Sequence, residues 1–420
     1  MQPPPLLEAL PFAGLLLSIA LFPMLAPRFW HRRLGAIAVF WSLLFLLPLA
    51  AHDGLRAALA ECWSALLTEY LPFVSVLLAL YATTGGILIR GGPGGTPASN
   101  TAWLAAGTLL AGVIGTTGAA MVLIRPLLRA NAHRAQKIHI VIALILLIGN
   151  AGGALSPLGD PPLYLGFLEG VPFFWPLRHL AWPLLVFAAP VLAGFYLLDR
   201  RSAAAAPRPR ARGRLRLRGR WHLVLIALIN FAVLGQAAWH PGTVRLFGAA
   251  IDGERLAASL LFLAIAWLAS AITPLAVREA NLFEWAPLVE IAKLFPAIFI
   301  TIAPVLALLA TPTQTPLSAT ANFWGSGLAS AFLDNAPTYL IFFRQAGGEG
   351  LPSDDALRAI SAGAVLFGGL TYIGNAPNMM IRTIAAQRGI RMPRFFGYTG
   401  LAALALAPAL GLVWAVCLRQ

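Results

Sequence analysis

Charged residues are scarce in this chain of 420 residues: Asp, Glu, Lys and Arg together make up 11% of the sequence. A soluble globular protein has about 25% charged residues, so the charge here is too low to cover the surface of a water-soluble domain. The apolar share is 59%, above the soluble range of about 45–50%. The composition therefore predicts an integral membrane protein that is solvated by lipid.

Cysteine is rare, and the common catalytic motifs are missing. Cys62 and Cys417 stand near opposite ends of the chain and in no motif, which argues against a disulfide scaffold. The sequence has no His-Glu-x-x-His, no Gly-x-Ser-x-Gly and no Walker loop, so we expect no enzyme and no bound cofactor.

No basic stretch precedes the first apolar run, so we expect that run to be a retained helix rather than a cleaved signal peptide.

Basic residues outnumber acidic ones and give a formal net charge of +14. Nine arginines form one tract between two apolar runs, with almost no interleaved aromatic residues: Arg200, Arg201, Arg208, Arg210, Arg212, Arg214, Arg216, Arg218 and Arg220. Such a tract favours a cytoplasmic loop that fixes membrane topology over a nucleic-acid-binding surface. We therefore expect membrane lipids, and no nucleic acid, as partners.

Ten apolar runs approach the length of about 20 residues that a spanning helix needs. They fall at about 11–27, 34–50, 62–89, 138–170, 180–198, 221–239, 256–274, 285–310, 356–381 and 395–417. Two further runs, 101–128 and 319–343, have small or polar residues in the middle: Gly115-Thr-Thr-Gly118 and Asp334-Asn-Ala-Pro337. We interpret these two runs as re-entrant hairpins, because non-helical backbone at membrane depth needs protein or water around it.

The arginines also predict an orientation. With the N-terminus outside, ten spans and two hairpins place 22 Lys and Arg residues in inner loops and 7 in outer ones. This bias follows the positive-inside rule and puts both termini on the periplasmic side.

The two halves of the chain resemble each other in their order of features. Residues 1–199 contain Glu69 on a span, the hairpin 101–128 and an interrupted span around 149–162; residues 221–420 contain Glu290 on a span, the hairpin 319–343 and an interruption around 374–378. The equivalent spans run in opposite directions on the predicted topology. The sequence thus predicts an all-α protein built as an inverted repeat, an architecture found in secondary transporters, with residues 200–220 as the basic linker.

Glycines and prolines interrupt both of these spans and cannot continue a regular helix. Unwound backbone frees carbonyls that can hold a cation and amides that can hold an anion. A simple kink, or a short loop between two spans, is the alternative.

Asp160 and Asp334 are the strongest candidates for an ion site, one in each half. A carboxylate at membrane depth costs about 3 kcal/mol or more and normally has a partner or a function. Two such acids suit alternate binding of a proton and a sodium ion, because burial favours the protonated form and a cation displaces the proton. As alternatives, Asp334 could cap the second helix of its hairpin and Asp160 could be an ordinary helix cap.

Polar groups near the breaks are candidate neutral ligands for an ion or substrate: Thr116, Thr117, Asn150, Ser156, Asn335, Thr338, Asn375 and Asn378. For the hydroxyls, a bond back to the local helix is the alternative. Glu290 and Lys293 are three residues apart on one span, so they form a local ion pair or Glu290 is a structural or proton-carrying carboxylate.

Four segments carry a resemblance to a known family: IGTTGAAMVLIRPLLRAN, GNAGGALSPLGDPPLYLGFLEGVPFFWPL, SAFLDNAPTYLIFF and TYIGNAPNMMIRTIA with GIRMPRFFGY. Over about residues 60–400 the chain resembles the bacterial citrate-transport family, whose members are commonly described as sodium/proton antiporters. That family belongs to a superfamily with arsenite permeases, dicarboxylate carriers and D-type sodium/proton antiporters. The resemblance implies two hairpins and two broken spans that meet at a central site, in a homodimer.

The tips of the hairpins depart from those of the dicarboxylate carriers. The carriers have Ser-Asn-Thr tips, whereas this chain has Gly-Thr-Thr-Gly and Asp-Asn-Ala-Pro. The change adds a carboxylate and removes polar donors, which disfavours a di- or tri-anion and is closer to the D-type antiporters.

We therefore expect a sodium/proton antiporter of the bacterial inner membrane, with Asp160 and Asp334 as the exchanging carboxylates. A sodium- or proton-coupled carrier of citrate or another carboxylate is the first alternative, and Arg125 and Arg382 are the basic residues that could favour it. An intramembrane enzyme or a channel subunit is the second.

Overall fold

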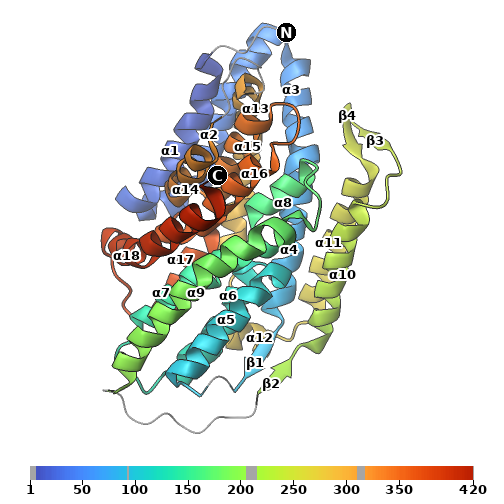
Figure 1. Ribbon diagram of the computed structural model, residues 1–420. Coiled ribbons are helices and arrows are strands. Elements are labelled where there is room, and N and C mark those ends of the chain that lie inside the picture. The colour runs from blue at the N-terminus through green and yellow to red at the C-terminus, as the bar shows by residue number, and fades with distance from the viewer. Residues whose placement is uncertain (1–5, 92–93, 205–214, 310–316, 420) are drawn as a thin grey trace.

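The computed structural model describes residues 6–91, 94–204, 215–309 and 317–419. Four arginines of the basic tract, Arg208, Arg210, Arg212 and Arg214, lie outside the described residues. The described chain is mostly helical and elongated, with one short strand pair near each end of its long axis (Figure 1).

The first half of the chain is helical except for one strand. Its elements are η1 (Leu6–Ala9), α1 (Leu10–Leu25), α2 (Pro27–Asp53), α3 (Leu55–Ser64), a π-helical segment η2 (Ala65–Tyr70), α4 (Leu71–Gly85), β1 (Leu88–Arg90), α5 (Pro97–Ile114), α6 (Thr116–Ala130), α7 (Ile138–Leu147), η3 (Ala151–Leu155), α8 (Pro161–Leu168) and α9 (Trp175–Ala204).

The second half adds three strands and a further set of helices. Its elements are β2 (Arg216–Arg218), α10 (Arg220–Gln236), β3 (Thr243–Leu246), β4 (Ala249–Asp252), α11 (Gly253–Ile272), α12 (Leu275–Ala280), α13 (Ala286–Leu309), α14 (Ala319–Leu333), α15 (Asn335–Gly347), α16 (Asp354–Leu366), η4 (Gly368–Leu370), α17 (Ala376–Gln387), α18 (Phe395–Val413) and the π-helical η5 (Trp414–Leu418).

Eight helices within the described residues are long and apolar enough to cross a membrane, compared with the ten runs predicted. The other two runs are shorter as helices. Helix α10 has 17 residues, and the run 356–381 is divided into α16 and α17, of 13 and 12 residues. Glycines and an Asn-Ala-Pro sequence between α16 and α17 end one helix and begin the next, as expected for residues that disfavour helix interiors.

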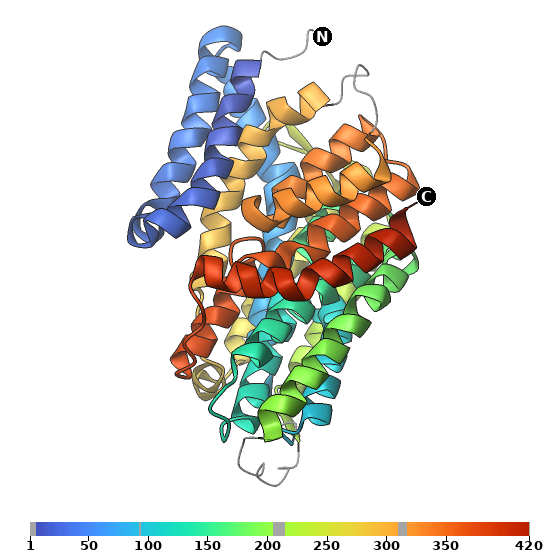
Figure 2. The ribbon, with the colours of Figure 1, turned by 60° about the vertical axis from the view of Figure 1, so that its left-hand side comes forward.

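Apolar side chains form two large cores. The first core is built mainly from α5, α6, α7, α9, α16, α17 and α18. The second core is built mainly from α1, α2, α4, α10, α11 and α13. Figure 2 shows α1, α2 and α13 standing together at one edge, while α18 crosses beside α9. Each core combines elements from both halves of the sequence.

Helices α8 and α15 lie between the two cores. Helix α8 contributes Leu163 to the first core and Leu165 to the second. Helix α15 contributes Tyr339 to the first core and Leu340 to the second. The residues that begin these two helices therefore lie where the two cores meet.

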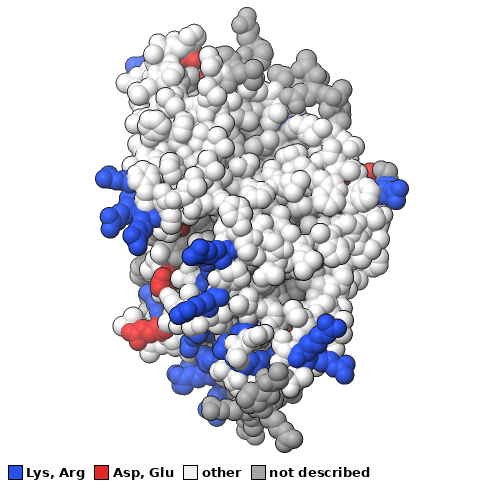
Figure 3. All heavy atoms as spheres, turned by 90° about the vertical axis from the view of Figure 1, so that its left-hand side faces the viewer, with Lys and Arg blue, Asp and Glu red and all other residues white. Residues whose placement is uncertain are grey.

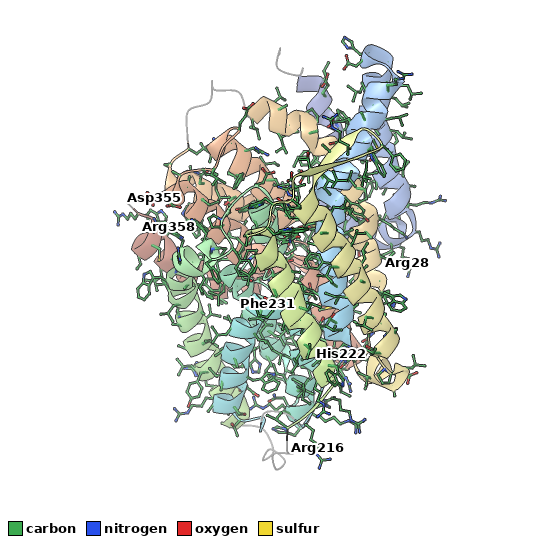
Figure 4. The ribbon with its side chains drawn as sticks, turned by 90° about the vertical axis from the view of Figure 1, so that its right-hand side faces the viewer. Arg28, Arg216, His222, Phe231, Asp355 and Arg358 are labelled. Carbon is green, nitrogen blue, oxygen red and sulfur yellow. The ribbon has the colours of Figure 1, made fainter. Side chains whose placement is uncertain are left out.

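The basic linker is tied to the rest of the chain by a strand pair. Strand β2 pairs antiparallel with β1, with Leu88 opposite Arg218 and Arg90 opposite Arg216. In Figure 4, Arg216 lies at the lower end of the molecule, Asp355 and Arg358 lie toward the upper end, and Arg28 lies between these levels. Arg28 and Arg216, which the predicted orientation places in inner loops, thus lie at different levels along the molecule.

Candidate functional site

Asp160 is the carboxylate at which both halves of the chain meet. Its side chain is 2% exposed. The Thr116 hydroxyl donates to Oδ1 at 3.0 Å, the Asn375 amide donates to Oδ1 at 2.8 Å, and the Asn335 amide donates to Oδ2 at 2.5 Å. Hydrogen bonds to a charged acceptor are among the stronger ones in proteins. Asp160 thus links two segments of the first half to two segments of the second.

Four helices begin around this carboxylate. Thr116 and Asn335 are the first residues of α6 and α15, and Asp160 and Asn375 are the residues immediately before α8 and α17. The N-terminus of a helix carries unsatisfied amides and a partial positive charge of about half an elementary charge. The four helix starts therefore create a positive potential around Asp160 without a basic side chain.

The local sequence explains why helices begin at these positions. Pro161 and Pro377 lie in the first turns of α8 and α17, where the fixed φ and missing amide of proline are favourable. Gly115 precedes α6 with a φ of +77°. A Cβ atom there would come within 3.3 Å of the Leu158 carbonyl oxygen, so glycine suits both the conformation and the space.

Asp334 immediately precedes α15 and lies close to Asp160. Its Oδ1 accepts a bond from the Ala336 amide at 3.2 Å, so the capping role considered for this residue is present. Its charge also interacts with those of Asp160 and Glu290. In the described part of the chain, no Lys, Arg or His nitrogen lies within 4 Å of either aspartate.

A pocket opens beside Asp160. It is bordered by α4, the tip Gly115–Gly118, the break Pro157–Pro161 and the start of α13, together with Tyr164, Asn375 and Ala376. Thr117, a predicted ligand, lies in this lining, and the lining contains no Lys or Arg. Arg125 and Arg382 are thus outside the pocket wall, and Arg382 instead lies over the ring of Tyr372 at 4.6 Å.

Asn150 and Asn378 join the two breaks instead of contacting Asp160. Asn150 Nδ2 donates to Asn378 Oδ1 at 2.8 Å. Asn378 Nδ2 donates to the carbonyls of Gly368 and Thr371 at 2.7 and 2.9 Å. Asn150 Oδ1 and Asn335 Oδ1 are buried and have no hydrogen-bond donor within the described residues. Such oxygens are suitable ligands for a hard cation.

Other predicted residues bond to groups other than the Asp160 carboxylate. The Ser156 hydroxyl donates to the Gly112 carbonyl, and the Thr338 hydroxyl donates to the Asp334 carbonyl at 2.8 Å. Glu290 accepts a bond from the Trp30 indole at 3.0 Å. Among the described residues, Glu290 and Lys293 form no ion pair within 4 Å, and Lys293 is exposed.

Two tyrosines of the pocket were not anticipated from the sequence. Tyr81 lies in the pocket wall and donates its hydroxyl to the Glu284 carbonyl at 2.6 Å. Tyr164 lies four residues after Asp160, on the same helical face. The i, i+4 spacing from Asp160 could have indicated Tyr164, whereas no local signal distinguishes Tyr81 from the other apolar residues of α4.

A family model described as "Putative citrate transport" matches residues 2–418. The chain belongs to this family. No curated protein matches the chain. The family match and the spanning helices make the protein a multi-pass membrane transporter and not an enzyme.

Proposed function

We propose that the protein is a secondary active carrier of citrate or a related carboxylate, coupled to Na⁺ or H⁺. The observation that supports it most directly is the convergence of four helix N-termini on one site. Helix N-termini bind carboxylates through free amides and the helix dipole. Thr117 and Gly118, in the first turn of α6, border the pocket. Citrate is the solute named by the family description.

Cation coupling follows from the acids of the site. Asp160 and Asp334 would repel an incoming carboxylate unless a cation or a proton offsets their charge. The unpartnered oxygens of Asn150 and Asn335 offer neutral ligands for Na⁺. In this proposal the solute and its coupling ion bind to the same group of helix starts, the solute at amides and the cation at oxygens.

Sodium/proton antiport is the second candidate, and one observation favours it. The pocket wall has two acids close by and no Lys or Arg. A site of this kind can exchange Na⁺ for H⁺ without any organic solute. Asp160 and Asp334 would then be the exchanging groups.

In the proposed architecture, α5 with α6 and α14 with α15 form two re-entrant hairpins, and the two halves of the chain form an inverted repeat. Asn100 on α5 and Asn131 after α6 donate to each other's side-chain oxygens at 2.9 Å, which supports α5 and α6 folding back on each other. A Cβ atom on Gly325 of α14 would lie 3.1 Å from the ring of Phe342 on α15, which supports the same arrangement there. With the basic linker on the cytoplasmic side, both termini would be periplasmic.

Proteoliposomes can separate the two candidates. The carboxylate carrier should take up radiolabelled citrate when an inward Na⁺ or H⁺ gradient is imposed, and citrate should be required for Na⁺ flux. The antiporter should move protons in response to Na⁺ with no citrate present. Asp355→Asn is a matched control for Asp160→Asn, because Asp355 is an exposed acid of α16 that does not line the pocket. Citrate uptake that does not depend on either gradient would contradict the proposal of a coupled carboxylate carrier.

A further inference from the structure

Arg125 is a buried cation with no acidic partner. It lies on α6, is 1% exposed and is among the largest fully buried side chains of the described residues. Its Nη1 donates to the Met121 carbonyl at 2.7 Å and its Nη2 to the Leu282 carbonyl at 3.2 Å, while its Nε has no acceptor. Arg125 is in none of the seven ion pairs found among the described residues.

The surroundings of Arg125 add positive charge. The charges of Arg129 and Arg388 repel that of Arg125, and those of Arg388 and Arg90 repel that of Arg129. Hydrogen bonds place these residues near one another: Arg129 donates to the carbonyl of Ile89, next to Arg90, and Gln387, next to Arg388, donates to Glu284, two residues after Leu282. The four arginines come from β1, from α6 and from the end of α17. Arg90, Arg129 and Arg388 are exposed. We call these four residues the arginine cluster.

Among the described residues, no carboxylate forms an ion pair with the arginine cluster within 4 Å. Glu284 is an acid whose charge attracts Arg125, and its Oε1 accepts a bond from the amide of Gln387, the residue next to Arg388, at 3.1 Å. Arg129 donates to the Ile89 carbonyl at 2.7 Å, which is a neutral acceptor. Four guanidinium groups therefore lie near one acid, Glu284, which forms no ion pair with them within 4 Å in the described part of the chain.

The loop before α13 contacts Arg125 through a backbone carbonyl. Leu282, whose carbonyl accepts from Arg125, has a φ of +45°, in the left-handed region that non-glycine residues rarely adopt. Next to it, Asn281 donates to the carbonyls of Gly85 and Ile87 at 2.9 Å each. This loop thus holds the guanidinium in place from one side and leaves its Nε without a partner.

We propose that the arginine cluster is a binding site for a multiply charged oxyanion, separate from the site at Asp160. Guanidinium groups match the planar oxygens of carboxylate and phosphate groups, and burial strengthens such bonds. Tyr81 connects the two sites, because it lines the pocket and its hydroxyl donates to the carbonyl of Glu284, beside the cluster. The oxyanion is either a soluble polyanion or the phosphate of an anionic lipid headgroup. Figure 3 shows Lys and Arg side chains gathered over the lower part of the molecule, where β1 and β2 also lie.

Binding of inorganic pyrophosphate tests this site apart from the transported solute. The full chain, in nanodiscs of phosphatidylcholine, should bind pyrophosphate by calorimetry. Each of Arg125→Gln and Arg388→Gln should weaken that binding by about tenfold or more, because each removes a charge-assisted hydrogen bond. Arg388 is exposed, so its variant does not depend on a buried replacement. Arg33→Gln removes an exposed arginine of α2 and should leave the binding unchanged.

A second arm distinguishes the source of the anion. In nanodiscs that contain phosphatidylglycerol, native mass spectrometry should find retained lipid in the parent chain and less in Arg125→Gln and Arg388→Gln if the ligand is a headgroup. Asp160→Asn should keep both kinds of binding, since Asp160 lies outside the cluster. Equal pyrophosphate binding and equal lipid retention in the parent chain and in both arginine variants would overturn the proposal. Loss of both kinds of binding in Asp160→Asn alone, at a temperature at which that variant remains folded, would also overturn it, because the anion would then bind in the central pocket.

Discussion

Gly115 and Asp334, one in each half of the chain, have nearly the same backbone conformation. Gly115 has φ +77° and ψ 152°, and Asp334 has φ +75° and ψ 143°. Each immediately precedes a helix that begins beside Asp160. A non-glycine residue in a rarely populated region costs about 1–3 kcal/mol. Gly115 thus adopts this conformation without backbone strain, whereas Asp334 keeps a carboxylate at the cost of backbone strain.

Replacing Asp334 with glycine should separate stability from function. Asp334→Gly removes the backbone strain and sacrifices only a helix cap, so the apparent Tm in detergent should be equal to or above that of the parent chain. Coupled transport in proteoliposomes should be lost, because the carboxylate is gone. Asp334→Asn is the control: it keeps a side-chain oxygen for the cap and should lose transport without the gain in Tm. Normal transport by Asp334→Gly would refute a functional role for this acid.

Adding a side chain at Gly115 should lower the stability of the protein. Gly115→Ala forces a Cβ atom toward the Leu158 carbonyl at a positive φ, which should lower the stability by about 1–2 kcal/mol. Gly194→Ala is a matched control, because Gly194 is inside α9 and a Cβ atom there meets no atom within 4 Å. We expect a lower apparent Tm for Gly115→Ala only. Equal Tm values would show that the turn before α6 tolerates a side chain.

Asp160→Asn should destabilise the site although the two side chains are nearly equal in size. Three donors point at the two oxygens of Asp160, and an amide offers only one oxygen in their place. At least one buried donor then loses its acceptor, at a cost of about 1–3 kcal/mol. The variant should therefore unfold at a lower temperature and lose coupling to Na⁺ and H⁺. A variant with unchanged Tm and unchanged coupling would contradict the geometry described.

Na⁺ affinity should fall as the pH falls. Protons and Na⁺ should compete for Asp160 and Asp334, because Asp160 is buried, Asp334 is partly buried, and the two acids repel each other when ionised. The apparent affinity should weaken by up to about tenfold per pH unit for each proton displaced. Calorimetric titration at several pH values, with and without citrate, measures this directly. Na⁺ binding that requires citrate would support the carboxylate carrier, and pH-dependent Na⁺ binding without citrate would support the antiporter.

The proposed topology can be tested with an impermeant thiol reagent. Gln136, after α6, and Glu349, after α15, are both exposed, whereas Asn131 is buried and bonded to Asn100. In a chain that lacks Cys62 and Cys417, Gln136→Cys should be labelled from the cytoplasm and Glu349→Cys from outside. Labelling of both from one face would end the inverted-repeat proposal.

The sequence indicated the class of the protein and the places where its helices break. Apolar runs, the shortage of charge and the basic tract predicted a multi-pass membrane protein, and the family match agrees with that prediction. The Gly-rich and Pro-rich segments around Gly149 and Gly374 predicted the interruptions that now separate α7 from α8 and α16 from α17. These features depend on residues close together in the chain, so local propensity is sufficient to reveal them.

The roles of individual polar residues depended on the tertiary structure. Asp160 and Asn375 are 215 residues apart in sequence, yet they are joined at 2.8 Å. Ser156 and Thr338, although close to the same breaks, bond to nearby carbonyls instead. The sequence determined which donors and acceptors stand beside interrupted helices. The packing of the two cores decided which of these donors and acceptors face Asp160. The direction in which a side chain points depends on how its helix packs against helices that are distant in the sequence.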